Sequence, residues 1–270
     1  MIVNKDCIEF LKSLPSESVD LVLTDPPYFI GFDGGKGWDS QWKTEDEYLD
    51  WCKVWSVECA RVLKPDRMMV VWGTLKTDTF LKYKLNILNE IPSLTGQNEI
   101  IWSYNWGGRQ KKNFARKHEY AWCYSKGDEF LFNADDIRVE RKMKKNLRTG
   151  EQHDKGTIPT SVWEKNNHTT AKDFCGWHPT TKNIEILERI IKAYTNPNDT
   201  VLDIFMGSGS TMVACNNAGR KGIGCELDPE YYEKSLVRID SLDNSLTKFF
   251  EEKCRFHLTY SLSCRILLFQ

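Results

Sequence analysis

The stretch Val19-Asp20-Leu21-Val22-Leu23-Thr24-Asp25-Pro26-Pro27-Tyr28 decides the fold. Residues 19–24 form a mainly apolar run, which is typical of a strand buried inside a parallel sheet. Residues 25–28 follow where that strand ends, and open α/β sheets bind their ligands at the carboxyl ends of their strands. The stretch therefore predicts an α/β fold with a functional site directly after this strand.

The four residues 25–28 suit one chemical task, which is to make an aromatic amino group attack an electrophile. The amino nitrogen of adenine or cytosine is a poor nucleophile because its lone pair is delocalised into the ring. The Asp25 carboxylate, ionised at neutral pH, and the Pro26 carbonyl can accept the two amino hydrogens and leave the lone pair free to attack. The prolines fix φ and carry no N–H, while Tyr28 offers a face on which a base can stack. A plain turn is the alternative, since Asp-Pro pairs are common in turns.

A second motif lies far along the chain, in residues 201–211, Val-Leu-Asp-Ile-Phe-Met-Gly-Ser-Gly-Ser-Thr. An apolar strand leads into a turn whose Gly207 and Gly209 allow a ligand to approach the backbone closely. Glu226 ends the next predicted strand, about where Rossmann-type folds place an acid on ribose hydroxyls. Met212 stands where a nicotinamide fingerprint has its third glycine. The motif therefore favours a nucleoside cofactor without phosphates, such as S-adenosylmethionine; a glycine-rich surface turn is the alternative.

With the Asp-Pro-Pro-Tyr motif first and the glycine turn last, the chain resembles the β group of the DNA amino-methyltransferases, which is typical of bacterial restriction–modification systems and phages. The resemblance spans residues 2–240. It implies a Rossmann-like methyltransferase fold with circularly permuted motifs, a mostly parallel sheet covered by helices on both faces, and an inserted target-recognition region. It also implies transfer of a methyl group from S-adenosylmethionine to N6 of an adenine flipped out of duplex DNA.

The resemblance assigns roles to individual residues. Residues 25–28 are implied as the catalytic group. Thr180 and Lys182 are implied to meet the methionine carboxylate of the cofactor, although Asn183 stands where the family usually has a proline. Further family motifs match at Trp38-Asp39 and His118-Glu119. The full set of implied cofactor-binding residues is Asp6, Cys7, Asp25, Thr180, Lys182, Asp203, Phe205, Gly207, Gly209, Ser210 and Glu226.

Adenine is the expected base, because in this family Asp at the first motif position goes more often with adenine and Ser with cytosine. A cytosine-N4 methyltransferase is the alternative within the family. Two other classes stay open: a nitrogen methyltransferase acting on RNA or protein, and a DNA-binding subunit without chemistry. Nitrogen methyltransferases that act on RNA or protein usually carry Asn, not Asp, before Pro-Pro-Tyr. Their glycine loop also precedes that motif, whereas here it follows. The second would be expected to have lost Asp25 or the glycine turn.

The net charge of the 270-residue chain is −1, so a DNA-binding surface has to come from the distribution of its charges. Two basic runs are candidate phosphate contacts, and an ordinary solvated face is the alternative for each. The candidate residues are Arg109, Lys111, Lys112, Arg116 and Lys117 in one run and Arg141, Lys142, Lys144, Lys145 and Arg148 in the other. Double-stranded DNA is the expected partner; a homodimer and a cognate restriction endonuclease are further candidates.

Composition predicts a cytoplasmic protein. No stretch reaches the length of a membrane span, and the chain enters a predicted strand at once, which leaves no room for a signal peptide. Nine cysteines without a Cys-x-x-Cys pair favour reduced thiols over a disulfide framework. The five histidines show no ligand spacing, so no metal is expected.

The alternation of predicted strands and helices indicates a parallel sheet with helices on both faces. One catalytic and cofactor-binding domain is expected over residues 1–132 and 177–240, with a target-recognition insertion at 133–176 and an extension of unknown role at 241–270. Strands are predicted near 2–5, 19–24, 68–72, 99–103, 119–124, 201–205 and 222–226. Helices are predicted near 45–63, 76–90, 184–195, 211–218 and 229–240.

Overall fold

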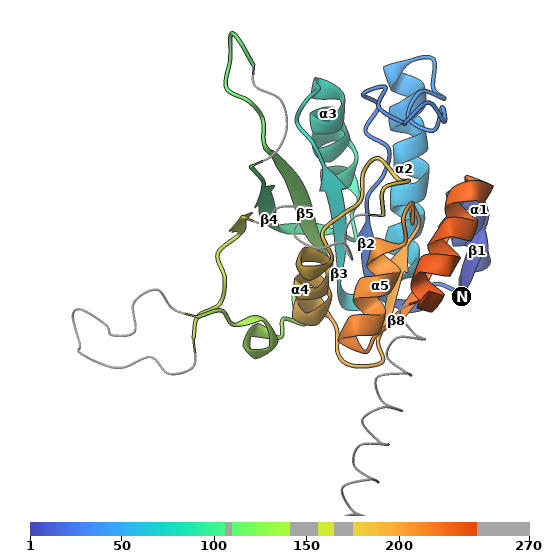
Figure 1. Ribbon diagram of the computed structural model, residues 1–270. Helices are drawn as coiled ribbons and strands as arrows, with labels where there is room; N and C mark the ends of the chain where they lie inside the picture. Colours follow the sequence, from blue (N-terminus) through green and yellow to red (C-terminus); the bar gives the residue numbers. More distant parts are fainter. Residues whose placement is uncertain (106–109, 141–155, 165–174, 242–270) are drawn as a thin grey trace, which may run out of the picture.

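The computed structural model describes residues 1–105, 110–140, 156–164 and 175–241, and these contain one sheet of eight strands (Figure 1). The order across the sheet is β1-β8-β7-β2-β3-β5-β4-β6. The strands are β1 (Ile2–Asn4), β2 (Val19–Thr24), β3 (Leu63–Gly73), β4 (Thr95–Ser103), β5 (His118–Lys126), β6 (Val162–Glu164), β7 (Thr200–Asp203) and β8 (Lys221–Glu226).

Within the described chain, β5 alone runs against its neighbours in the sheet. It is antiparallel to β3 on one side and to β4 on the other, whereas the remaining neighbouring pairs are parallel. The predicted α/β fold with a mostly parallel sheet is therefore confirmed. Because β5 is reversed, the β4–β5 loop leaves the sheet at the same edge as the carboxyl ends of the parallel strands.

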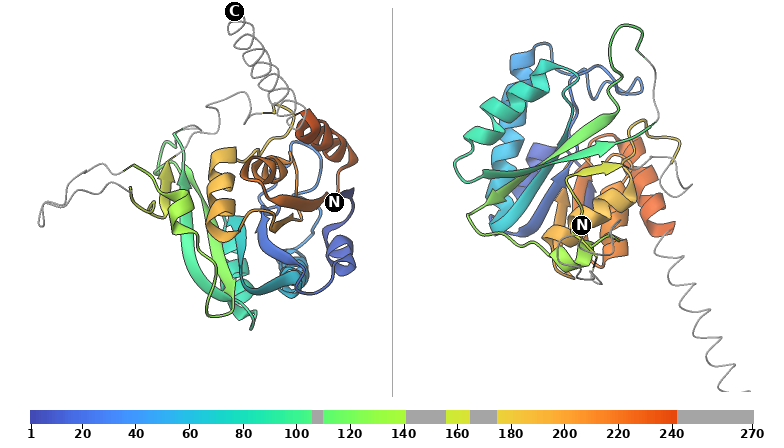
Figure 2. Two further views of the ribbon diagram at one scale, coloured as in Figure 1. Left: turned by 90° about the horizontal axis from the view of Figure 1, so that it is seen from below. Right: turned by 90° about the vertical axis from the view of Figure 1, so that its left-hand side faces the viewer.

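Helices cover both faces of the sheet, as the right-hand view of Figure 2 shows. All six residues of β2 are buried, and successive side chains of a strand point to opposite faces. Leu21 and Leu23 join the apolar cluster that includes the helices α4 and α5, while Val22 joins the cluster that includes α1, α2 and α3. The helices are α1 (Cys7–Ser13), α2 (Glu45–Val62), α3 (Asp78–Asn86), α4 (Ile184–Tyr194), α5 (Ser210–Ala218) and a further helix over residues 229–241.

The elements differ from the predicted ones mainly where they are short. The sequence prediction misses α1, which has only seven residues but buries Phe10 and Leu11 and is capped by the Asp6 side chain. It also misses β6, a three-residue strand that pairs with β4. The helix predicted over 76–90 is divided into α3 and the 3-10 turn η1 (Leu88–Glu90). Such short elements depend on tertiary packing, which local patterns do not reveal.

The predicted target-recognition insertion at 133–176 is described in part. Its described residues form the 3-10 turn η2 (Ala134–Ile137), a bridge between Val139 and Thr157, and β6. Residues 141–155, 165–174 and 242–270 lie outside the described chain, so the predicted division at 133, 177 and 241 stays a prediction. Among the described helices, none has the length and apolar character needed to cross a membrane.

A buried carboxylate ties three strands together at the edge of the sheet where β2 begins. Asp20 is 2% exposed, and its Oδ1 lies 2.9 Å from Lys64 Nζ and 3.2 Å from the Arg67 guanidinium, both on β3. Its Oδ2 accepts a hydrogen bond of 3.0 Å from the N–H of Thr200, the first residue of β7. A buried charge is tolerated when it is paired and hydrogen-bonded, so Asp20 fixes β3 and β7 on either side of β2.

We expect Asp20→Ala to lower the free energy of unfolding by about 2–4 kcal/mol, because the Thr200 N–H and Lys64 lose their acceptor and Arg67 keeps only its ion pair with Asp199. Chemical denaturation followed by circular dichroism measures the change. Asp135→Ala removes the exposed ion-pair partner of Arg138 and serves as the control, with no measurable change expected. Equal effects of the two substitutions would contradict a structural role for Asp20.

Candidate active site

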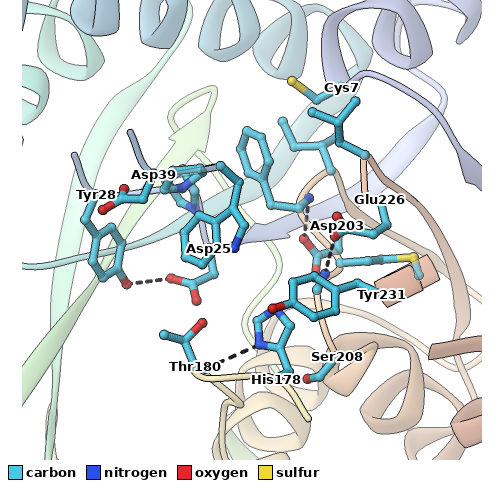
Figure 3. A pocket seen from close by; sticks show the side chains of 18 of the residues that line it. Cys7, Asp25, Tyr28, Asp39, His178, Thr180, Asp203, Ser208, Glu226 and Tyr231 are labelled. Carbon is cyan, nitrogen blue, oxygen red and sulfur yellow. Dashed lines mark hydrogen bonds between the residues drawn. The ribbon is translucent and has the colours of Figure 1, made fainter. Parts of the chain in front are cut away.

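A pocket opens at the carboxyl edge of the sheet, where β2, β7 and β8 end (Figure 3). Segments far apart in the sequence form its walls: the loop after β2, the turn after β7, the end of β8 and the segment before α4. Of the predicted cofactor-binding residues, Gly209 does not line this pocket. The predicted residues that line it are Asp6, Cys7, Asp25, Pro26, Pro27, Tyr28, Thr180, Lys182, Asp203, Phe205, Gly207, Ser210 and Glu226.

A buried carboxylate holds the loop after β2 in one shape. Asp39 is 1% exposed and accepts hydrogen bonds of 2.6, 2.9 and 3.1 Å from the backbone N–H groups of Phe29, Ile30 and Phe32. Phe29 has φ of 54°, a left-handed conformation that residues other than glycine rarely adopt. The hydrogen bonds to Asp39 stabilise it and so fix the direction in which residues 25–28 face the pocket. The sequence places Asp39 in a family motif, but this clamp is visible only in the structure.

Both oxygens of the Asp25 carboxylate accept a hydrogen bond from a neighbouring side chain. The Tyr28 hydroxyl donates to Oδ1 at 2.5 Å, a contact drawn in Figure 3, and the Lys182 ammonium lies 2.5 Å from Oδ2. Burial, together with the Asp25 charge, raises the pKa of Tyr28 well above its ordinary value. Tyr28 therefore stays a neutral donor, and its ring packs edge-on against Phe80 at 5.0 Å between centroids.

Lys182 lies between two carboxylates. Its Nζ is 2.5 Å from Asp25 and 3.0 Å from Oε2 of Glu119, the second residue of β5. Burial lowers the pKa of Lys182, but the two carboxylates outweigh it and hold the pKa above its ordinary value. The sequence predicts that Lys182 meets the cofactor carboxylate, which stays a prediction. The structure adds that its ammonium contacts the catalytic motif, and that Glu119 belongs to the same charged group.

Asp203, at the end of β7, connects the two motifs. Its Oδ1 accepts hydrogen bonds from Thr24 Oγ1 at 3.0 Å and from the N–H of Phe205 at 3.1 Å. Thr24 directly precedes Asp25, so the bond joins the end of β2 to the start of the glycine turn. Burial raises the pKa of Asp203 to about 6, although its hydrogen bonds favour the charged form.

The glycine turn folds back onto the end of β8. Gly207 N–H donates to Glu226 Oε2 at 2.7 Å, and Asp228 N–H donates to Oε1 at 2.9 Å. Gly207 has φ of 48°, and a Cβ at this position would lie 2.7 Å from the ring of His178. The turn therefore needs glycine here for conformation and for space. Burial raises the pKa of Glu226, while the two N–H groups oppose that rise.

Gly209 does not line the pocket, and the cofactor contact predicted for it stays a prediction. It has φ of 76° and precedes α5. A Cβ at this position would lie 3.2 Å from Ser235 and 3.3 Å from Ile239, both in the helix over residues 229–241. Gly209 therefore lets the turn pack against this helix, behind the pocket wall.

The two ends of the pocket differ in chemistry. Figure 3 shows Tyr28 and Asp25 at one end and Cys7 and Glu226 at the other. At the second end, Phe205 also lines the pocket and packs against Trp51 with 5.4 Å between ring centroids. An acid beside an aromatic and apolar surface suits a nucleoside, whose ribose hydroxyls bond a carboxylate and whose base packs on rings.

The described candidate DNA-binding residues lie on the β4–β5 loop. Lys111, Lys112 and Arg116 are exposed. Arg116 donates to the carbonyl of Leu75, and Lys117 donates to the Asn105 carbonyl at 3.0 Å. The structure therefore places them on one loop beside the pocket, and their contact with DNA stays a prediction. The other candidates, Arg109, Arg141, Lys142, Lys144, Lys145 and Arg148, lie outside the described residues.

Known proteins share both the sequence pattern and this architecture. The sequence model of a family described as DNA methylase matches residues 19–237. This chain belongs to that family. A relative from Escherichia coli (strain K12), named DNA adenine methyltransferase YhdJ, is 36% identical, with 88% of this chain and 82% of that protein covered. The Type II methyltransferase M.HpaI of Haemophilus parainfluenzae is 31% identical, with 94% and 78% covered.

Solved structures agree with this assignment. The M1.HpyAVI complex with S-adenosylmethionine matches with a TM-score of 0.62 and 25% identity, covering 88% of this chain and 98% of that one. The cytosine-N4-specific PvuII DNA methyltransferase has the same fold, with a TM-score of 0.69, 22% identity and coverage of 88% and 85%. The chain is thus a DNA methyltransferase of the N6/N4 family that uses S-adenosylmethionine.

The pocket fits S-adenosylmethionine. Glu226, Cys7 and Phe205 are the residues that would hold its nucleoside, and Gly207 lines the pocket beside them. Thr180 and Ser210 line the same pocket and would reach its polar methionine end. Among the described residues, no cluster of three His, Cys, Asp or Glu side chains could hold a metal ion.

His178, which the sequence analysis did not single out as a ligand, packs over the glycine turn. Its ring contacts Tyr231 with 4.6 Å between centroids, and its Nδ1 accepts from Thr180 N–H at 3.3 Å. Burial, followed by the charges of Lys182 and Arg238, lowers the pKa of His178 to about 4. The neutral ring is therefore part of the folded pocket.

This pKa predicts a loss of stability in mild acid. Unfolded histidine titrates near pH 6.5, so between about pH 6.5 and 4 the unfolded state binds the proton more readily. The contribution of His178 is present above pH 6.5 and is lost as the pH falls. From pH 7 to pH 5, the wild type should lose about 1–2 kcal/mol of unfolding free energy relative to His178→Gln. The contribution of Asp203 to the unfolding free energy has the opposite pH dependence, but both proteins contain Asp203, so it cancels from their difference. Unfolding free energies of wild type and His178→Gln that change in parallel with pH would contradict the prediction.

Proposed function

We propose that this DNA methyltransferase transfers the methyl group to N6 of an adenine flipped out of duplex DNA, at a specific site. The observation that carries the proposal is the position of Asp25, in the same pocket as Glu226 and the glycine turn. The name of the Escherichia coli relative, at 36% identity, supports adenine as the base. The cytosine-N4-specific PvuII enzyme, at 22% identity, bears on the fold alone.

In the proposed mechanism the protein prepares the amino group for attack. The Asp25 carboxylate and the Pro26 carbonyl accept the two amino hydrogens, and Tyr28 supports the ring of the base. S-adenosylmethionine supplies an electrophilic methyl group. As the nitrogen gains positive charge, the Asp25 carboxylate stabilises that charge. The amino group loses one proton during or after methyl transfer, which leaves the neutral methylated amine. The Asp39 clamp keeps residues 25–32 in position, so that little of the alignment has to be achieved during the reaction.

The experiment that tests the function compares the wild type with Asp25→Ala. DNA from cells expressing each protein is mapped for modified bases, and its nucleosides are then analysed. We expect N6-methyladenine in one short motif, lost in Asp25→Ala, while the variant still binds S-adenosylmethionine. N4-methylcytosine as the only product would replace adenine with cytosine. Robust methylation by Asp25→Ala would contradict the mechanism.

The β4–β5 loop is the part of the described chain that best suits contact with the duplex. It extends beyond the sheet at the carboxyl edge, next to α3 in Figure 1, and carries the exposed Lys111, Lys112 and Arg116. Phe114, at 93% exposure, lies among these cations. Glu119, a few residues further on, lines the pocket. Cations suit the phosphates, and an exposed aromatic ring suits insertion between base pairs.

Phe114 thus takes the role of a wedge that occupies the space left by the extruded base. We expect Phe114→Ala to lower kcat/KM on a fully paired duplex by about tenfold, because extrusion costs a few kcal/mol in stacking and pairing. A duplex with an abasic position opposite the target adenine has already lost the pairing, so most of the loss should be recovered there. Phe132→Ala, at a ring that is 41% exposed outside this loop, is the control. An equal loss on both substrates would contradict the wedge.

The Type II names of several relatives support a place in a restriction–modification system. We propose that the protein is the modification enzyme of such a system, which protects the motif that a separate endonuclease cleaves. Transformation of the motif-bearing DNA into cells that carry the endonuclease, with and without this protein, measures that protection. A homodimer stays a prediction.

A further inference from the structure

The charged group in the pocket consists of Asp25, Lys182 and Glu119, and the proposed mechanism gives the Glu119 carboxylate no role. Lys182 has a side chain that is 9% exposed, and it pairs with Asp25 at 2.5 Å and with Glu119 at 3.0 Å. Its ammonium also lies 5.6 Å from the ring centroid of Tyr28 and 5.4 Å from that of Trp72. One buried cation therefore serves two carboxylates, inside an aromatic wall.

The same contacts compete with the proposed base for Asp25. The target amino group needs the Asp25 carboxylate as acceptor, but Tyr28 and Lys182 each already donate to one of its oxygens. The hydrogen bond from an ammonium to a carboxylate is charge-assisted and stronger than one from a neutral arylamine. Each carboxylate oxygen can accept a second hydrogen bond, but the Lys182 ammonium beside Oδ2 offsets the charge of Asp25. Full use of that charge by the base therefore requires Lys182 to move away.

Glu119 gives the displaced ammonium a place to go. Its Oε2 is buried and, among the described residues, has no hydrogen-bond donor besides its ion-pair partner Lys182. A lysine side chain has several rotatable bonds, so a small rotation moves its Nζ from Asp25 toward this oxygen. Without Glu119, the displaced ammonium would be a buried charge without a partner, which is strongly unfavourable.

We propose that Glu119 is a positioning residue that receives the Lys182 ammonium when the target base takes its place on Asp25. The inference rests on the proposed function. Before base entry, Lys182 orients the Asp25 carboxylate through their ion pair. After base entry, Lys182 and Glu119 form a neutral pair, and the Asp25 charge is left to face the nitrogen that becomes positive during transfer.

The test uses Glu119→Gln, which keeps the shape of the side chain and removes its charge, in the full-length protein. Lys182 then has Asp25 as its sole charged partner in this group, so base entry becomes harder. We expect the single-turnover methylation rate to fall about tenfold, while the dissociation constant for S-adenosylmethionine stays within about twofold. Glu99→Gln, which loses an ion pair with Lys84 at the outer sheet, is the matched control and should keep the wild-type rate.

The double variant Glu119→Gln/Lys182→Met separates this role from a purely structural one. It removes both the competing ammonium and the carboxylate that receives it, so at saturating S-adenosylmethionine its methylation rate should exceed that of Glu119→Gln. A rate at or below that of the single variant would overturn the proposal, as would a wild-type rate in Glu119→Gln. A selective loss of cofactor affinity in Glu119→Gln would also overturn it, because it would place Glu119 in cofactor binding.

Failure of the proposed function gives a different result. In that case the wild-type protein produces N4-methylcytosine or no methylated DNA. Failure of the exchange leaves the wild type producing N6-methyladenine and changes only the relative rates of the variants. Thermal denaturation of each variant with bound S-adenosylmethionine verifies that the rates come from folded protein.

Discussion

The pairing of β2 with β7 is the constraint on which the rest of the site depends. In the register, Leu21 lies opposite Val201 and Val22 opposite Leu202, so the two strands end side by side. The hydrogen bond between Thr24 and Asp203 then closes the junction in a buried position. Residues separated by most of the chain thereby face one pocket. A slip of one residue in this register would turn every side chain of β2 to the other face.

Carboxylates inside the protein fix the loops and turns around the pocket. Asp20, Asp39, Asp203 and Glu226 each accept backbone N–H groups, and Asp20 is additionally paired with cations. Acceptors of this kind specify the path of a loop because the buried carboxylate is costly unless its hydrogen bonds are made. The pocket is therefore shaped by polar constraints, while the two apolar clusters hold the layers together.

Much of this architecture was predictable from the sequence, and the reasons for the exceptions are physical. The apolar runs that become β2, β7 and β8 are local signals, and so is the amphipathic pattern of α4. By contrast, α1 and β6 are short and form through their neighbours. The contact of Lys182 with Glu119 could not be read from the sequence, because it depends on the reversed β5, which brings Glu119 to the pocket. The clamp at Asp39 likewise needs the three-dimensional path of the loop. The predicted fold is confirmed, whereas the predicted roles of the site residues stay predictions.

The reversal of β5 also separates the β4–β5 loop from the position of Glu119, so that the loop can change while Glu119 stays in place. The strands β4 and β5 are held by their pairing from Ser103–His118 inward, so the body of this hairpin has a fixed place beside β3. Of the described loop residues, Arg116 contacts the carbonyl of Leu75, whereas the side chains of Lys111, Lys112 and Phe114 are exposed. The length and side chains of the loop can therefore diverge among descendants of this chain without moving Glu119 or the sheet. The outer part of the loop and the site around Glu119 can in this sense change independently.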